Sequence, residues 1–303
     1  MRISTNTMYQ AGISKIGSLQ SEQSKLQQQI SLSKRILTPS DDPVAAARAL
    51  GIEQVQNLNN QYARNRVTAK NQLSTVETTL SNISELLTAA QSSLVSAGNP
   101  TYDNSQRGFL AQELRGSLDQ LIGLANTKDG AGNYLFSGFQ TNTAPFVKTA
   151  TGANYQGDDG QQFLQVTTGR QLSVSDTGRN IFQTGSDVFA SLTNLINLLE
   201  TPIATAADAA ALTAGLATNG AALDKTVDNV LNARASVGTK LKELDSLDTA
   251  GQDQDLQLTK ALSELQDLDY AKAISQLSQQ QMILSAAQQS FVKTVGLSLF
   301  NLI

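Results

Sequence analysis

Apolar residues recur at alternating intervals of four and three along much of the chain, which is the spacing of a coiled-coil seam. No proline interrupts residues 44–99 or 203–303, so both stretches are predicted to be helical. At 1.5 Å per residue the first helix would be roughly 80 Å long. Each stripe taken alone could instead pack inside an ordinary helical bundle within one chain, and would then not form a coiled-coil seam. The predicted seam of the first stretch is Gly51, Val55, Leu58, Tyr62, Arg66, Ala69, Leu73, Val76, Leu80, Ile83, Leu87, Ala90, Leu94 and Ala97.

Weaker or shorter stripes flank this long helix. Residues 12–37 keep the same spacing but place Gln and Ser at seam positions, so this helix is predicted to be marginal without a partner. A third helix is predicted from about Asn104 to Thr127. Its buried edge would consist of Leu110, Leu114, Leu118, Leu121 and Ala125.

The middle of the chain changes character. Residues 134–189 hold eight of the fifteen aromatic residues, and glycines recur there, which indicates short strands and turns. Segments 163–169 and 171–175 alternate in polarity and are predicted to form a hairpin. Clustered aromatics could form a binding platform, but beside glycines they more often form a small core. The predicted core of this β-rich insert is Tyr134, Phe136, Phe139 and Phe146.

Helical periodicity returns after the insert, first over Val188–Leu199 and then beyond Pro202. Gly251 is expected to interrupt the later pattern. The return seam is predicted to be Leu216, Gly220, Leu223, Val227, Val230, Arg234, Val237, Leu241 and Leu244. The terminal seam is predicted to be Tyr270, Ile274, Leu277, Gln281, Leu284, Gln288, Phe291, Val295, Ser298 and Leu302.

These elements predict a mainly α protein: an elongated helical bundle or coiled coil formed by both chain ends, with a small β-rich insert in the middle. Five divisions are predicted. They are an N-terminal coiled-coil segment (1–42), the first half of a helical rod (43–132), the insert (133–186), the return half of the rod (187–251) and a C-terminal coiled-coil segment (252–303).

Composition argues against several classes of chemistry. The chain has no His, Cys or Trp, which removes the imidazole base, the thiolate nucleophile and most transition-metal ligand sets. With 26 acidic and 22 basic residues its net charge is -4, unlike that of a strongly basic nucleic-acid-binding domain. We therefore expect no enzymatic activity, no cofactor, no metal, and no nucleic-acid or membrane partner.

A few polar motifs could carry a site. Ser40, Asp41 and Asp42 precede Pro43, an arrangement predicted to cap the long helix; as an acid–base pair the adjacent carboxylates would diverge. Residues 158–160 and 253–255 hint at calcium loops but lack the remaining ligands at the required offsets.

A short basic cluster on the long helix consists of Arg64, Arg66 and Lys70. A solvated face or an ion pair between subunits is more consistent with this pattern than anion recognition. Glu77, or Asp245 of another copy, is a candidate partner that the sequence cannot assign.

Several segments resemble the flagellin family of bacterial flagellar axial proteins. Residues 33–50 resemble its N-terminal region, and the Pro39-Ser-Asp-Asp-Pro43 version resembles the members at the hook–filament junction. Supporting segments are Met1-Arg-Ile-Ser-Thr5, Gly132-Asn-Tyr-Leu-Phe-Ser-Gly138, and residues 230–238, 267–277 and 297–303.

The resemblance implies an extracellular structural protein of the flagellum, exported by the flagellar type III apparatus without a cleaved signal peptide. It implies self-assembly in a helical ring between the first hook-associated protein and flagellin. An export chaperone is expected on the terminal helix, near residues 277–303. Alternatives are a minor flagellin, or a type III-secreted binding protein that acts through its β insert.

The resemblance also implies that the terminal helices pair into an inner coiled-coil layer. The sequence agrees with this, because an apolar stripe on a short helix is marginal without neighbours. Their ordering on assembly would restrain premature polymerisation. The predicted assembly interface is Ile16, Leu19, Leu26, Ile30, Leu37, Ile274, Leu277, Leu284, Phe291, Val295 and Leu302.

Overall fold

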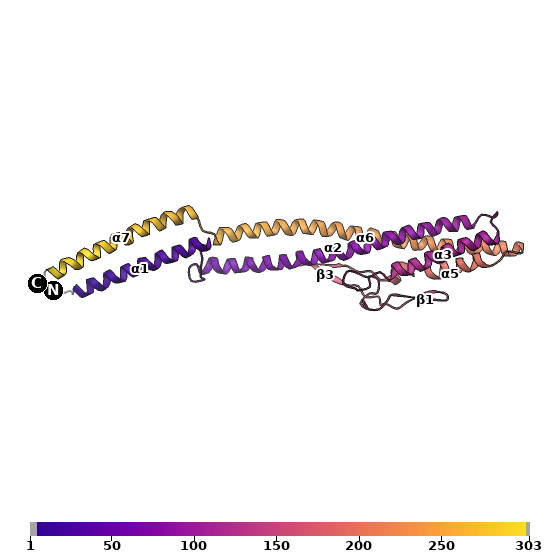
Figure 1. The fold of residues 1–303 in the computed structure, drawn as a ribbon, viewed down its shortest axis with the longest axis horizontal. Helices are drawn as coiled ribbons and strands as arrows, with labels where there is room; N and C mark the ends of the chain where they lie inside the picture. Colours follow the sequence, from indigo (N-terminus) through magenta and orange to yellow (C-terminus); the bar gives the residue numbers. More distant parts are fainter. Residues whose placement is uncertain (1–4, 301–303) are drawn as a thin grey trace. The chain divides into compact units, whose positions relative to one another are not determined.

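The computed structural model describes residues 5–300, and within that range the chain is mainly α-helical with two short β-hairpins near its middle (Figure 1). This confirms the predicted class of a helical protein with a small β insert. The chain divides into two compact units. Unit 1 comprises residues 1–58 and 252–303, and unit 2 comprises residues 59–251. Helices α2 (Pro43–Ala97) and α6 (Ala206–Gln266) contribute to both units.

Unit 2 holds a continuous hydrophobic core. Its helices are the later part of α2, α3 (Asn104–Ala125), α5 (Val188–Glu200) and the earlier part of α6. The predicted seam of α2 is confirmed here, since its apolar positions from residue 69 are buried except for half-buried Leu94. These buried seam residues are Ala69, Leu73, Val76, Leu80, Ile83, Leu87, Ala90 and Ala97.

Helices α3 and α5 begin at carboxylate caps. Asp103 Oδ1 accepts a hydrogen bond from the Gln106 amide at 2.7 Å, and the Gln106 side chain accepts one from the Asp103 amide in return. Asp187 accepts hydrogen bonds from the amides of Phe189 and Ala190. Each such cap satisfies amides that the first turn of a helix leaves without partners.

The β insert contains two antiparallel hairpins and one short helix. Strand β1 (Phe146–Thr149) pairs with β2 (Gly152–Tyr155), and β3 (Phe163–Thr167) pairs with β4 (Arg170–Ser173). Helix α4 (Gly178–Phe182) follows. The hairpin predicted around residues 163–175 is confirmed as β3–β4.

The aromatic core of the insert differs from its prediction. Phe136 and Phe146 are fully buried, and Phe182 and Phe189 join them at ring-centroid distances of 4.7 to 5.9 Å. Tyr134 is half-buried.

Phe139, expected in this core, is 64% exposed. Its ring covers Gly160, where a Cβ atom would lie 2.1 Å from the ring. The Asp158 carboxylate holds this corner, because its Oδ1 accepts hydrogen bonds from the amides of Phe139 and Gly160. Turn geometry, rather than hydrophobicity, therefore places Phe139 outside the core.

Helix α6 passes through Gly251 without a break, contrary to the expected interruption. Gly251 is buried, and a Cβ atom there would lie 2.4 Å from Arg66 Nη2. Arg66 is itself buried and binds Asp248 Oδ1 at 2.8 Å and the Val166 carbonyl oxygen at 3.2 Å. The glycine costs helix propensity of about 1 kcal/mol but leaves space for the guanidinium.

Ion pairs between α2 and α6 extend this contact within unit 2. Lys70 Nζ lies 2.6 Å from Asp245, and Arg234 lies 2.9 Å from Glu77. Both pairs form within one chain, so the alternative left open by the sequence, an Asp245 from another copy, is not needed for Lys70. The order of partners along the two helices shows that they run antiparallel.

Replacing Gly251 by Ala should lower the stability of unit 2. The new methyl group displaces the Arg66 guanidinium from Asp248 and Val166, which outweighs the helix-propensity gain of about 1 kcal/mol. Gly238→Ala is the matched control on the same helix, because no atom lies within 4 Å of its Cβ position, and it should be stabilising. Urea unfolding of both variants measures the difference; equal gains would contradict the packing role of Gly251.

Candidate assembly interface on the paired terminal helices

The first and last helices of the chain form an antiparallel pair in unit 1 (Figure 1). Helix α1 spans Thr5–Leu32 and α7 spans Tyr270–Phe300. Near one end of the pair, the rings of Tyr9 and Phe291 lie 5.0 Å apart. Gly12 permits this approach, because a Cβ atom there would lie 2.7 Å from the Phe291 ring. Near the other end, the Tyr270 hydroxyl donates to the Ile30 carbonyl oxygen at 3.3 Å.

A polar network ties the loop after α1 to the loop after α6. The Arg35 amide donates to the Gln266 carbonyl oxygen, and Arg35 Nη2 donates to the Leu265 carbonyl oxygen, both at 2.7 Å. The Leu268 amide donates to the Ser33 carbonyl oxygen at 3.2 Å. These bonds place the two connections of unit 1 beside one another, although they lie far apart in the sequence.

Asp41 organises the turn between α1 and α2. Its carboxylate lies 2.6 Å from Lys25 Nζ and accepts hydrogen bonds from the amides of Thr38 and Leu37 at 3.0 Å. The hydrogen bond from Lys25, followed by the two amides, lowers the pKa of Asp41 from 3.8 to about 2.

The predicted capping residues therefore have different roles. Asp42 Oδ1 accepts a hydrogen bond from the Ala45 amide in the first turn of α2, and this bond is the main reason its pKa is lowered. Asp41 accepts hydrogen bonds from the loop before α2 and not from the helix itself. Ser40 is exposed and, within the described part of the chain, has no hydrogen-bond partner.

The predicted interface residues mostly form the seam inside this pair. Leu19 and Leu26 are each 7% exposed and are the large apolar side chains buried among the described residues of unit 1. Six further residues are half-buried: Ile16, Ile30, Leu37, Leu277, Leu284 and Phe291. The side chains of Val295 and Leu302 lie outside the described residues.

Two of these residues do not occupy the seam positions predicted for them, although their part in an assembly interface stays a prediction. Ile274 is 53% exposed, and Ala273 takes the buried position beside it. The same shift by one residue occurs at two later seam positions of α7. Gln280 and Ala287 are half-buried there, whereas the predicted Gln281 and Gln288 are exposed. Leu37 is not helical, because α1 ends at Leu32 and Ser33 adopts a left-handed φ of 59°.

The seam of α2 is also displaced within unit 1. Gly51, Val55 and Leu58 were predicted to be seam residues, but all three are exposed. Gln56 faces α6 instead, and its Nε2 donates to Asp255 Oδ1 at 3.0 Å and to Thr259 Oγ1 at 3.1 Å. In this part of α2, the face that contacts α6 contains Gln56, and the adjacent Val55 is exposed to solvent.

Unit 1 consequently leaves much apolar surface uncovered. A shallow hollow of about 490 Å³ between α2 and α6 is lined by Gly51, Ile52, Val55, Leu258, Ala261 and Leu265 among others. Sequence reasoning missed most of these exposed positions, because they flank the seam that it selected. The exposed large hydrophobic residues of unit 1 are Met8, Tyr9, Ile13, Leu32, Val44, Leu50, Val55, Leu58, Leu256, Tyr270, Ile274, Met282, Ile283 and Val292.

The features described for unit 1 are packing surfaces and hydrogen-bonded loops. Among the described residues, no three His, Cys, Asp or Glu side chains converge as metal ligands. No helix in the described part of the chain is long and apolar enough to cross a membrane. The exposed apolar residues of unit 1 form a candidate packing surface for other helices.

Asp41 makes the stability of unit 1 depend on acidity. Because its pKa is lowered from 3.8 to about 2 in the folded chain, its contribution is present above about pH 4 and is lost as the pH falls towards 2. Asp41→Asn should lower the stability of unit 1 at neutral pH and should reduce the loss of stability between about pH 4 and pH 2. Lys25→Met should shift this loss to higher pH, whereas the control Lys15→Met on the same helix should not. Hydrogen exchange of α1 amides from pH 5 to 2 tests this, and an unchanged Asp41→Asn profile would contradict it.

Comparison with known proteins gives consistent matches. Residues 3–141 match the bacterial flagellin N-terminal helical region. The chain is 38% identical over 317 aligned positions to flagellar hook-associated protein 3 of Escherichia coli (strain K12), covering 100% of this chain and 99% of that protein. Identity and coverage are the same for flagellar hook-associated protein 3 of Salmonella typhimurium.

Solved structures share the fold. A structure described as a flagellar hook-associated protein from Vibrio parahaemolyticus is 27% identical, with a TM-score of 0.69, over 75% of this chain and 100% of that one. The flagellar junction protein FlgL from Legionella pneumophila is 21% identical, with a TM-score of 0.64, over 73% of this chain and 100% of that one.

Proposed function

The chain belongs to the family of flagellar hook-associated protein 3, and from this premise we propose that it is a structural adaptor between the flagellar hook and the flagellin filament. Its partners would be the first hook-associated protein on the hook side, flagellin on the filament side, and further copies of itself in a helical ring. Its place would be the extracellular hook–filament junction. The mechanism is packing and not catalysis.

The contrast between the two units is the observation that supports this proposal. The continuous core lies in unit 2, whereas the residues of unit 1 whose burial is described, 7–58 and 252–294, include only Leu19 and Leu26 as large buried apolar side chains. Burying one exposed Leu, Ile or Met is worth about 1.5–3 kcal/mol. Several such residues per subunit would favour helix–helix association strongly, and a head-to-tail contact that does not close gives a helical array.

The same contrast bears on export and on the timing of assembly. A helix pair with so small a core is marginal by itself, so its full ordering would depend on neighbouring copies. We propose that this restrains polymerisation before the chain leaves through the type III apparatus, without a cleaved signal. A chaperone that covers the terminal helix from about Leu277 onwards would serve the same end.

A secreted binding protein acting through the β insert is less well supported. Phe136, Phe146 and Phe182 of the insert are buried with Phe189 of α5, so these four offer no platform to a ligand, and the exposed rings of the insert are Phe139 and Phe163. A minor flagellin has the same need for helical packing, and the full-length identity to hook-associated protein 3 favours the junction role over it.

Charged substitutions on the exposed face should separate assembly from folding. Ile274→Asp and Met282→Asp replace side chains that are open to solvent, so the melting temperature of the monomer should change little. Polymerisation, followed by light scattering and electron microscopy, should be abolished because a charge would enter an apolar interface.

Leu231→Asp is the matched control, because it places the same charge on an exposed position of unit 2. It should assemble normally. Leu26→Asp provides the opposite control, since it should destabilise the α1–α7 pair itself. Normal assembly of Ile274→Asp and Met282→Asp would contradict the proposed interface.

The cellular role is tested in a motile strain that lacks this gene. Such cells should carry hooks without filaments and release flagellin into the medium. The full-length chain should restore filaments, whereas Ile274→Asp with Met282→Asp should not. Normal filaments in the deletion strain would contradict the junction role and favour a minor flagellin or a secreted binding protein.

A further inference from the structure

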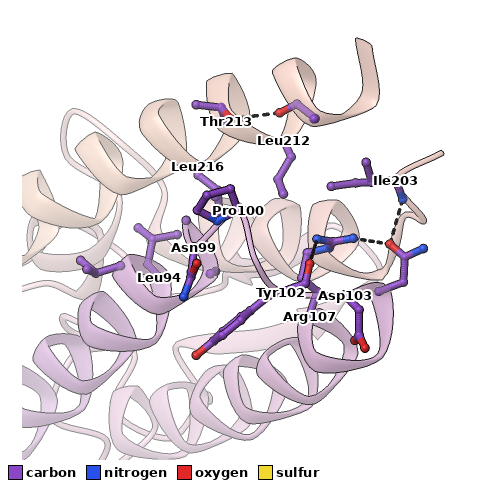
Figure 2. Close-up of a pocket in the computed structure, with 15 residues that line it drawn as sticks. Leu94, Asn99, Pro100, Tyr102, Asp103, Arg107, Ile203, Leu212, Thr213 and Leu216 are labelled. Carbon is purple, nitrogen blue, oxygen red and sulfur yellow. Dashed lines mark hydrogen bonds between the residues drawn. The ribbon is translucent and has the colours of Figure 1, made fainter. Parts of the chain in front are cut away.

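A hollow of about 640 Å³ lies in unit 2 where α2 turns into α3 and the first turns of α6 approach (Figure 2). Its volume is within the range of pockets that hold small organic groups. Tyr102 and Asn99 come from the turn. The apolar walls are formed by Leu94, Ala97, Pro100, Ile203, Leu212 and Leu216.

Arg107 brings an unneutralised charge into these walls. Arg107 lines the hollow and is only 6% exposed. Its Nε atom is buried and has no hydrogen-bond acceptor. Nη1 donates to the Tyr102 carbonyl oxygen at 2.6 Å, and Nη2 donates to Asn104 Oδ1. Among the described residues, Arg107 has no carboxylate within ion-pair distance, in contrast to buried Arg66 with Asp248. A guanidinium has five N–H donors, so most of its donor capacity is unused here.

The nearby acidic residue does not neutralise this charge. Asp103 also lines the hollow, but its Oδ1 accepts the Gln106 amide and caps α3. Asn104 Oδ1 accepts the Ile203 amide at 3.0 Å as well, so it is already shared between two donors. The Tyr102 carbonyl and Asn104 are neutral acceptors, and a neutral donor could bind them equally well. These two hydrogen bonds therefore do not explain why a charged side chain is buried here.

We propose that this pocket binds a carboxylate group carried on an apolar stem. The Nη protons that have no acceptor suit a carboxylate, which guanidinium recognises through charge-assisted hydrogen bonds, whereas the Nε–H is closed off from solvent. The apolar walls suit the stem. A buried cation that lacks an acidic partner in its own chain gains such a partner from the ligand, which offsets the loss of its hydration.

This carboxylate could come from a free organic acid or from a Glu or Asp side chain of a neighbouring protein chain. The rim includes Val95, which is 79% exposed and could contact either. The chemistry that the pocket recognises is the same in both cases, and binding to the isolated chain does not depend on the function proposed above.

Titration of the 15N-labelled full chain with sodium hexanoate, at constant ionic strength, tests the proposal. Hexanoate should shift the Arg107 Nε–H resonance and resonances of residues 94–107 saturably, with a Kd in the millimolar range typical of a small fragment. Neutral hexanamide should bind at least about tenfold more weakly, because it lacks the charge. Equal shifts with both compounds, or no saturable shift, would overturn the proposal.

Variants identify the pocket as the site. Arg107→Met should weaken hexanoate binding at least about tenfold, whereas Arg115→Met, which removes an exposed positive charge from the same helix, should leave it unchanged. If Arg107→Met disturbs the turn, Thr213→Trp fills the mouth of the hollow and keeps the guanidinium. It too should block hexanoate, and unaltered binding by this variant would overturn the proposal.

A final comparison distinguishes the two sources, and it alone relies on the proposed self-assembly. Hexanoate at about ten times its Kd should slow polymerisation of the wild-type chain, relative to hexanamide, if a neighbouring chain supplies the carboxylate. An unchanged rate, together with Arg107-dependent hexanoate binding, assigns the pocket to a free organic acid.

Discussion

Burial of one apolar stripe, on the half of α2 that lies in unit 2, is the interaction on which the rest of the structure depends. Residues such as Leu73, Leu80 and Leu87 are fully buried in a core that they share with α3, α5, α6 and the β insert. The insert joins that core through Phe146 and Phe189, which pack on one another at 4.7 Å. Unit 1 has the same helical periodicity, but its helices pack as pairs: α1 with α7, and the first part of α2 with the last part of α6. Its apolar residues are therefore incompletely covered, and they form the surface that the proposed association would bury.

Polar seam positions give the two long helices a defined alignment. Arg66 with Asp248, Asn59 with the Gly251 carbonyl oxygen, and Gln56 with Asp255 each pair a residue of α2 with a particular level of α6. Leu and Ala stripes alone tolerate a shift by one turn more easily than such pairs do. The polar residues thus contribute specificity of register, and the apolar ones contribute most of the free energy.

Much of the fold could be predicted from the sequence, because the spacing of apolar residues and the positions of proline are local properties. The helices of unit 2 and the β3–β4 hairpin followed from them. The phase of the seam could not be predicted in unit 1, since Gln56 and Ala273 face inward while Val55 and Ile274 face solvent. Gly251 and Phe139 were misjudged because their roles depend on Arg66 and Gly160, which are distant in sequence. The buried Arg107 carried no sequence signal, as its environment exists only once α2, α3 and α6 meet.

The β1–β2 hairpin bears on how such a chain can vary in length. Gly152 is buried against the backbone of Phe189 and Ala190 in α5, whereas Ala150 and Thr151 at the tip of the hairpin are exposed. Extra residues accommodated there would add little loop-closure entropy cost and would leave the helical seams in register. Homologous chains could therefore acquire or lose whole surface domains at this point, while the helices that govern packing stay the same length.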